Sequence, residues 1–188
     1  MEVQEGWFRC FKCDGLVFGQ GESRGVCPVD NRPHEVSVST GMYVVPFGNA
    51  HAGAHAGELR GRPERQGDWR WCHKCQGMFF AGNANDQGFC PAAFIPSFAR
   101  DPRDVRRFGP HDGSRSGHYA IMFDDGSVTF EQHWRWCRKC QALFHGSRPS
   151  LLGPIPGGGI CPATPERDRF GHDGSKSGKY QLEPDPNQ

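Results

Sequence analysis

The sequence lacks an excess of charge of either sign, and it lacks any long hydrophobic run. Its 22 basic residues are balanced by 21 acidic ones, for a formal net charge of +1. No bulk electrostatic attraction to nucleic acid or to an anionic membrane is therefore expected. No apolar stretch approaches the roughly 18 residues that a membrane-spanning helix needs. The segment Met1–Phe8 lacks the charged and apolar regions of a secretory signal, so we expect a protein that stays in the cytoplasm or is released without such a signal.

Hydrophobic residues are also scarce for a chain with one large core. They make up 36% of the sequence, whereas Gly (26) and Pro (15) are abundant. This composition favours turns and short strands over long helices. Aromatic residues reach 12%, which argues against disorder, because disordered chains contain few of them.

Three segments of the sequence share the pattern W-x-x-C-x-K-C-x-[GA]-[LM]-[VF], beginning at Trp7, Trp69 and Trp134. Each continues to Gly-x-Cys-Pro, then to a His, a turn rich in Ser and Gly, and a Tyr. All nine cysteines, all five tryptophans and all three tyrosines belong to this pattern. We therefore interpret the chain as three diverged repeats. The predicted domain is 1–188, with repeat 1 at 1–45, repeat 2 at 67–123 and repeat 3 at 132–184.

The cysteine count indicates metal binding rather than disulfides. Three cysteines per repeat, nine in all, cannot all pair. Cys-x-x-Cys places two thiolates on one tight turn, the third comes from Gly-x-Cys-Pro, and a recurring His offers a fourth ligand. Three cysteines and one histidine form an established structural zinc set, and soft ligands of this kind select zinc over magnesium or calcium. The predicted sets, one Zn²⁺ each, are Cys10, Cys13, Cys27 and His34; Cys72, Cys75, Cys90 and His111; and Cys137, Cys140, Cys161 and His172.

Two alternatives apply to these residues. Each His could instead be a buried imidazole bonded to the backbone of the Ser/Gly turn. Cys-x-x-Cys also occurs at redox sites, but that chemistry is typical of a βαβ context without a third cysteine.

Strand, turn, strand and a later strand at each Tyr predict an all-β fold with almost no helix. We favour a pseudo-threefold body with one shared core, like a β-trefoil, because large apolar residues recur in every repeat. The alternative is three tandem zinc ribbons. Residues 44–66, 92–110 and 146–159 are predicted loops, with a short helical turn in the second, and His51 and His55 fall in the first.

The string W-x-W-C-x-K-C-x-x-L-F, followed by G-x-C-P and H-D-G-S-x-S-G-x-Y, resembles a repeat of functionally uncharacterised bacterial proteins. The resemblance covers most of the chain and implies no function. Repeat 1 departs from it, because Arg9 replaces the second Trp and His34-Glu-Val-Ser replaces His-Asp-Gly-Ser.

Three hypotheses for function follow. The first is a non-enzymatic binding module, lectin-like or associated with a toxin, that recognises carbohydrate or a protein partner, because a zinc ion with four protein ligands leaves no open position. The second, less favoured on net charge, is nucleic-acid binding through Trp-Arg-Trp at 69–71 and 134–136 and the arginines of 100–107. The third is a zinc-dependent hydrolase, which requires the His to leave a position for water. Candidate ligand contacts for the first are the turn residues Asp112, Ser114, Asp173 and Ser175.

Overall fold

The computed structural model describes residues 2–48, 64–93, 108–146, 149–150, 153–156, 159–163 and 171–187. His51, His55 and residues 94–107, where a helical turn is predicted, lie outside them. The described residues contain eleven strands and one 3-10 turn, η1 (Val38–Thr40). The strands are β1 (Glu2–Arg9), β2 (Leu16–Phe18), β3 (Met42–Gly48), β4 (Arg65–Trp71), β5 (Met78–Phe80), β6 (His118–Phe123), β7 (Glu131–Trp136), β8 (Leu143–His145), β9 (Pro149–Ser150), β10 (Gly153–Pro156) and β11 (Tyr180–Pro184).

Each repeat contributes one long strand that pairs with two others. In repeat 1, β1 pairs antiparallel with β2 across the Cys-x-x-Cys turn and with β3 on its other side. Repeats 2 and 3 do the same with β4, β5 and β6 and with β7, β8 and β11. The Trp of each first strand stands opposite the Tyr of the third strand. These pairs are Trp7 with Tyr43, Trp69 with Tyr119, and Trp134 with Tyr180.

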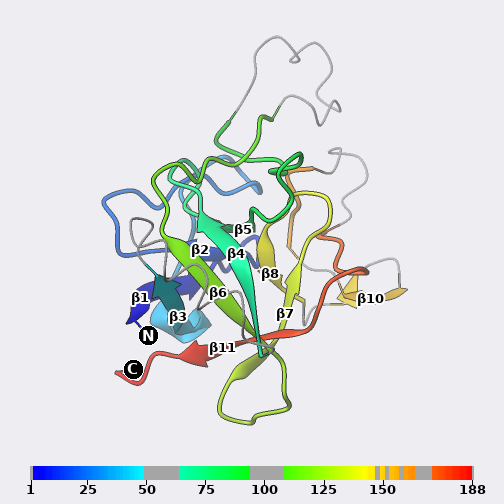
Figure 1. Ribbon diagram of the computed structural model, residues 1–188. Coiled ribbons are helices and arrows are strands. Elements are labelled where there is room, and N and C mark those ends of the chain that lie inside the picture. Colours follow the sequence, from blue (N-terminus) through cyan, green and yellow to red (C-terminus); the bar gives the residue numbers. More distant parts are fainter. Residues whose placement is uncertain are drawn as a thin grey trace.

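The three repeats close into a barrel-like sheet around one axis (Figure 1). The third strands β3, β6 and β11 pair with one another in all three combinations. The hairpins at the Cys-x-x-Cys turns also meet in a ring. Single bridges join Val17 to Gly77, Phe79 to Ala142, and Phe144 to Gly15. The predicted pseudo-threefold all-β body is therefore confirmed.

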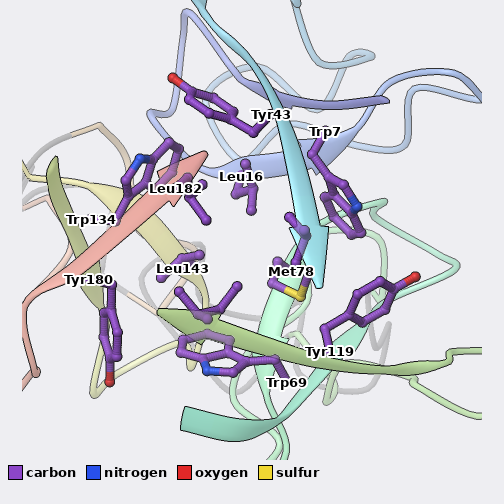
Figure 2. Packing of buried hydrophobic residues seen from close by; sticks show 12 residues of the cluster. Trp7, Leu16, Tyr43, Trp69, Met78, Tyr119, Trp134, Leu143, Tyr180 and Leu182 are labelled. Atoms are coloured by element: carbon purple, nitrogen blue, oxygen red, sulfur yellow. The ribbon is translucent and has the colours of Figure 1, made fainter. Parts of the chain in front are cut away.

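One hydrophobic core on the axis is shared by all repeats, as Figure 2 shows. Every repeat contributes the same four positions, which are the Trp, the first residue of the second strand, the Tyr and the residue two beyond it. Independent zinc ribbons would each need a separate core, so the shared one contradicts that alternative. The core residues are Trp7, Leu16, Tyr43 and Val45; Trp69, Met78, Tyr119 and Ile121; and Trp134, Leu143, Tyr180 and Leu182.

Neighbouring repeats are joined by an aromatic pair. The indole of Trp7 meets the ring of Tyr119 edge to face at 5.3 Å, and Trp69 meets Tyr180 in the same way at 5.7 Å. Trp134 and Tyr43 complete the set at 5.3 Å. Such pairs contribute about 0.5–1.5 kcal/mol beyond the area they bury. We call the contact of repeats 1 and 2 the first junction, that of repeats 2 and 3 the second, and that of repeats 3 and 1 the third.

Two of the predicted loops are partly wrong. Residues 44–48 continue β3, and 65–66 already belong to β4, because each pairs with a neighbouring strand of the barrel. Within 146–159, β9 and β10 form a separate two-stranded sheet. The described residues supply three paired strands per repeat to the main sheet. This arrangement does not establish the specific topology of a β-trefoil, which stays a prediction.

Candidate metal centres

The Cys-x-x-Cys turns are shaped by backbone hydrogen bonds. In repeat 2, the Cys72 amide donates to the Gly77 carbonyl at 2.9 Å, and the Gln76 amide donates back to the Cys72 carbonyl at 2.8 Å. Gln76 has a φ of 64°, a left-handed conformation that closes the turn. The same pattern recurs in repeats 1 and 3, where Asp14 and Gln141 have φ values of 59° and 65°. The turn points both thiols to one side of the hairpin.

Each of the three predicted ligand sets is brought together by the fold. Within a set, one ligand atom from each residue lies within 4.8 Å of the other three, and all twelve residues are buried. The histidines lie in the segments before β3, β6 and β11, and the amides of His34 and His111 donate at 3.2 Å to the Arg24 and Gln87 carbonyls. The differing Cys-to-His spacings therefore converge on one geometry. The sets are Cys10, Cys13, Cys27 and His34; Cys72, Cys75, Cys90 and His111; and Cys137, Cys140, Cys161 and His172.

The distances fit a tetrahedral zinc ion. Zinc–sulfur and zinc–nitrogen bonds of usual length place two sulfurs about 3.8 Å apart and a sulfur and a nitrogen about 3.5 Å apart. The Cys72 and Cys90 sulfurs are separated by 3.7 Å. The Cys75 sulfur lies 3.4 Å from His111 Nδ1. A disulfide would need about 2.05 Å, and all nine cysteines are free thiols. Each set therefore holds one structural zinc ion.

Thiol acidity in the clusters follows from their crowding. Hydrogen bonds from Cys13 and Cys27 to the Cys10 sulfur hold the Cys10 pKa well below its usual range. The bond to Cys10 raises the pKa of Cys27 to about 12. Repeat 2 behaves alike, with the pKa of Cys90 raised to about 12 by its bond to Cys72. The raised pKa values of Cys27 and Cys90 favour protonated thiols when no metal is bound, so zinc binding in repeats 1 and 2 displaces protons.

Two of the zinc histidines, His34 and His111, also reach the next repeat. His34 Nδ1 faces its cysteines at 3.6 Å from the Cys13 sulfur, while its Nε2 lies 3.1 Å from the Cys75 carbonyl oxygen of repeat 2. His111 Nε2 lies 3.1 Å from the Cys140 carbonyl oxygen of repeat 3. With Nδ1 on the metal, the Nε2–H donates to that carbonyl and fixes the ring. This bond connects one metal centre to the turn of the next.

The Gly of Gly-x-Cys-Pro is explained by the same contact. Gly25, Gly88 and Gly159 all have positive φ, between 59° and 69°. A Cβ on Gly88 would overlap the Cys140 carbonyl, and one on Gly159 would overlap the Cys13 carbonyl. Only glycine allows this approach of one repeat to the next. The sequence signal is the invariance of this Gly across the three repeats.

The predicted ligand contacts lie beside the metal centres. The Asp112 and Asp173 amides donate to the Cys72 and Cys137 sulfurs, both at 3.3 Å. Both carboxylates accept from the amide two residues on, at Ser114 and Ser175, at 3.0 Å. Asp173 also accepts a 2.6 Å bond from Arg138, and that bond and the Ser175 bonds lower its pKa despite partial burial. These turns therefore have a structural role at the zinc sites, and a ligand role for them stays a prediction.

Sequence reasoning missed the residue that follows each Cys-x-x-Cys. Gln76 accepts the Trp71 indole N–H at 3.2 Å and donates to the His73 carbonyl at 2.9 Å. Gln141 accepts from Trp136 at 3.1 Å in the same way. A repeated Gln two residues before the second strand was the available signal, because its left-handed φ would otherwise favour Gly or Asn.

Comparisons with known proteins add no relative. No protein-family model matches the chain, and no curated protein and no solved structure matches it either. Three zinc-binding repeats are nonetheless evident from the ligand sets themselves. A search of the described residues finds no helix long and apolar enough to cross a membrane.

Proposed function

We propose that the protein is a non-enzymatic, zinc-stabilised binding module, lectin-like in character, whose ligand is a carbohydrate or a partner protein. Each zinc set supplies four buried protein ligands, which leaves no coordination position for water or substrate. Structural zinc contributes folding free energy, which compensates for a small apolar core. A binding role then falls to the surface, where the repeats differ.

A surface hollow at the first junction carries the proposal. Its volume is about 400 Å³, and it combines two aromatic rings with carboxylates and side-chain amides. Aromatic faces stack on the C–H faces of sugars, while carboxylates and amides hydrogen-bond to hydroxyls. Of the two ligand classes, this mixture favours carbohydrate. The residues that line it are Glu2, Val3, Gln4, Glu5, Phe18, Gln20 and Phe47.

The hollow is built rigidly. Phe18 packs edge to face against Trp7 at 5.5 Å and against Trp71 at 6.2 Å, and Phe47 packs on Tyr119 at 5.4 Å. The Gln4 side-chain oxygen accepts the Tyr119 hydroxyl hydrogen bond. A preformed site loses little conformational entropy on binding.

The charge of the hollow selects among sugars. Glu2 and Glu5 are its charged residues, and both are acidic and exposed. Like-charge repulsion disfavours sialic and uronic acids, so we expect neutral or amino sugars. The exposed Ser114 and Ser175 of the zinc-site turns are a second proposed contact surface.

A glycan array probed with the zinc-loaded protein tests this proposal. We expect binding to neutral or amino sugars that weakens at least tenfold in Glu5→Gln and Gln20→Ala. Glu22→Gln is the matched control. Glu22 is an exposed carboxylate on the loop that also carries Gln20, and it lies outside the hollow. Binding to oligonucleotides that collapses with added salt, and none to glycans, would instead support the nucleic-acid hypothesis and overturn this one.

A further inference from the structure

The third junction differs from the other two at four positions. At the first junction, Phe18 meets Trp71, and the indole N–H of Trp71 donates to Gln76. These three side chains and Gln4 form one neutral set, in which Gln4 accepts a hydrogen bond from the Tyr119 hydroxyl. The second junction repeats this neutral set residue for residue. Its members are Phe80, Trp136, Gln141 and Gln66.

All four neutral side chains are replaced by ionisable ones at the third junction. His145 replaces the Phe, and Arg9 replaces the Trp. Asp14 replaces the Gln that follows the Cys-x-x-Cys turn, and Glu131 replaces the Gln that is bonded to the Tyr. We call these four residues the charged junction. Repeat 3 contributes His145 and Glu131, and repeat 1 contributes Arg9 and Asp14.

The charged junction keeps the backbone geometry of the neutral ones. The His145 amide donates to the Asp14 carbonyl at 2.8 Å, as Phe18 and Phe80 donate to Gln76 and Gln141 at 2.9 Å. The Tyr43 hydroxyl donates to Glu131, as the other two tyrosines donate to glutamines. The change is therefore one of charge rather than of architecture.

The charges are paired within and across the junction. Arg9 donates to the Asp14 carboxylate at 2.7 Å, and the Asp14 side chain is 0% exposed. His145 Nε2 lies 3.0 Å from Glu131, and His145 is buried. Across the junction, Arg9 lies 4.0 Å from Glu131. Burial alone would raise the pKa of Glu131, yet the adjacent His145 imidazole and the hydrogen bond from Tyr43 hold it below its usual range.

We propose that the charged junction is a matched interface by which repeat 3 closes the ring on repeat 1 and on no other repeat. Three repeats with identical contact faces could close in several orders, within one chain or between copies. A charged face placed against a neutral one loses the contact of Arg9 with Glu131 across the junction, so that these two partly buried residues keep ionic partners only within their own repeats. Loss of an ionic partner at a partly buried position lowers stability. Buried polar sets of this kind fix register in other assemblies at a cost in stability.

A double-mutant cycle tests whether the four residues act as one set. One half variant, Glu131→Gln/His145→Phe, gives repeat 3 the neutral face, and the other, Arg9→Trp/Asp14→Gln, does so for repeat 1. We expect each half variant to unfold at a lower urea concentration than the wild type. The combined four-residue variant, whose third junction matches the other two, should unfold at the wild-type concentration or higher. Effects of the halves that simply add in the combined variant would overturn the proposal.

A second measurement separates ring order from stability. The wild type and the four-residue variant are refolded from urea with zinc at high protein concentration and weighed by native mass spectrometry. Because all junctions of the variant are alike, we expect a larger share of dimers and trimers, each still with three zinc ions per chain. If the variant is as stable as the wild type and gives no larger share of oligomers, the charged junction does not select the closing partner and the proposal is wrong.

Discussion

Replacement of Gly88 by alanine should weaken the second junction. Gly88 has a φ of +69°, and a Cβ at this position would overlap the carbonyl of Cys140 in repeat 3. That carbonyl also accepts the hydrogen bond of the zinc ligand His111. The overlap with Cys140 can be relieved only by moving repeat 2 away from repeat 3, because the two nearest atoms belong to the Cys140 backbone.

The expected cost has two parts that a control separates. A left-handed backbone costs an alanine about 1–2 kcal/mol, and forcing an extra methyl group into a packed contact costs about 1–3 kcal/mol more. Gly126 has a φ of +82° and nothing within 4 Å of its Cβ position. Its amide bonds to Asp124 two residues before it, as the Gly88 amide bonds to Asp86. Gly126→Ala therefore carries the backbone cost alone, about 1–2 kcal/mol, against about 2–5 kcal/mol for Gly88→Ala.

Urea unfolding of the zinc-loaded proteins, followed by tryptophan fluorescence, measures both values. A slope of about 2 kcal/mol per molar urea converts them to midpoint shifts of about 0.5–1 M for the control and about 1–2.5 M for Gly88→Ala. Equal shifts in the two variants would refute the reasoning, because the close approach of the repeats would then have no energetic weight.

Two further predictions concern the metal centres. His111→Cys keeps four zinc ligands but removes the hydrogen bond to the Cys140 carbonyl. Native mass spectrometry should still count three zinc ions, while the free energy of unfolding falls by about 1 kcal/mol. Loss of a zinc ion would contradict this. Because raised pKa values, about 12 for Cys27 and Cys90, keep thiols protonated without metal, zinc binding releases protons and weakens as pH falls. With two protons displaced at each site of repeats 1 and 2, where two thiols have raised pKa values, chelator competition should show about a 100-fold weaker affinity per pH unit at these sites. A flat profile would exclude this linkage.

Local patterns in the sequence predicted the parts of the molecule that recur in all three repeats. Cysteine parity predicted zinc, and the Trp, the apolar residue after the Cys-x-x-Cys turn and the Tyr predicted a shared core. The structure contains the three predicted ligand sets and the shared core. The fourth core position is occupied by Val45, Ile121 and Leu182, which fall in the strand predicted at each Tyr. That these side chains point into the core is seen in the structure. The prediction of 44–66 as a loop failed at its ends because pairing with a distant strand, Phe47 with Tyr119, extends β3.

Contacts between repeats could not be predicted from one repeat at a time. Arg9 was visible as a departure from the Trp pattern, but its cross-junction partner Glu131 lies far along the chain, and nothing local relates them. His145 likewise stands where the pattern has Phe, and its meaning depends on knowing that repeat 3 adjoins repeat 1. Register between repeats is a tertiary property, set by which strands pair at the third junction.

The positions that agree in all repeats and those that differ have separate explanations. The agreeing positions are accounted for by zinc ligation, the axial core and the close glycine contacts, all of which any ring of this kind needs. Selection for these three shared features alone would leave the three junctions alike. They are not alike, since the first carries a hollow with Glu2 and Glu5 and the third carries the paired charges of Arg9 and Glu131. Both departures involve β1 of repeat 1, so the repeat with the weakest match to the pattern is the one in which we expect roles that the other repeats do not share: ligand binding at the hollow and ring closure at the charged junction.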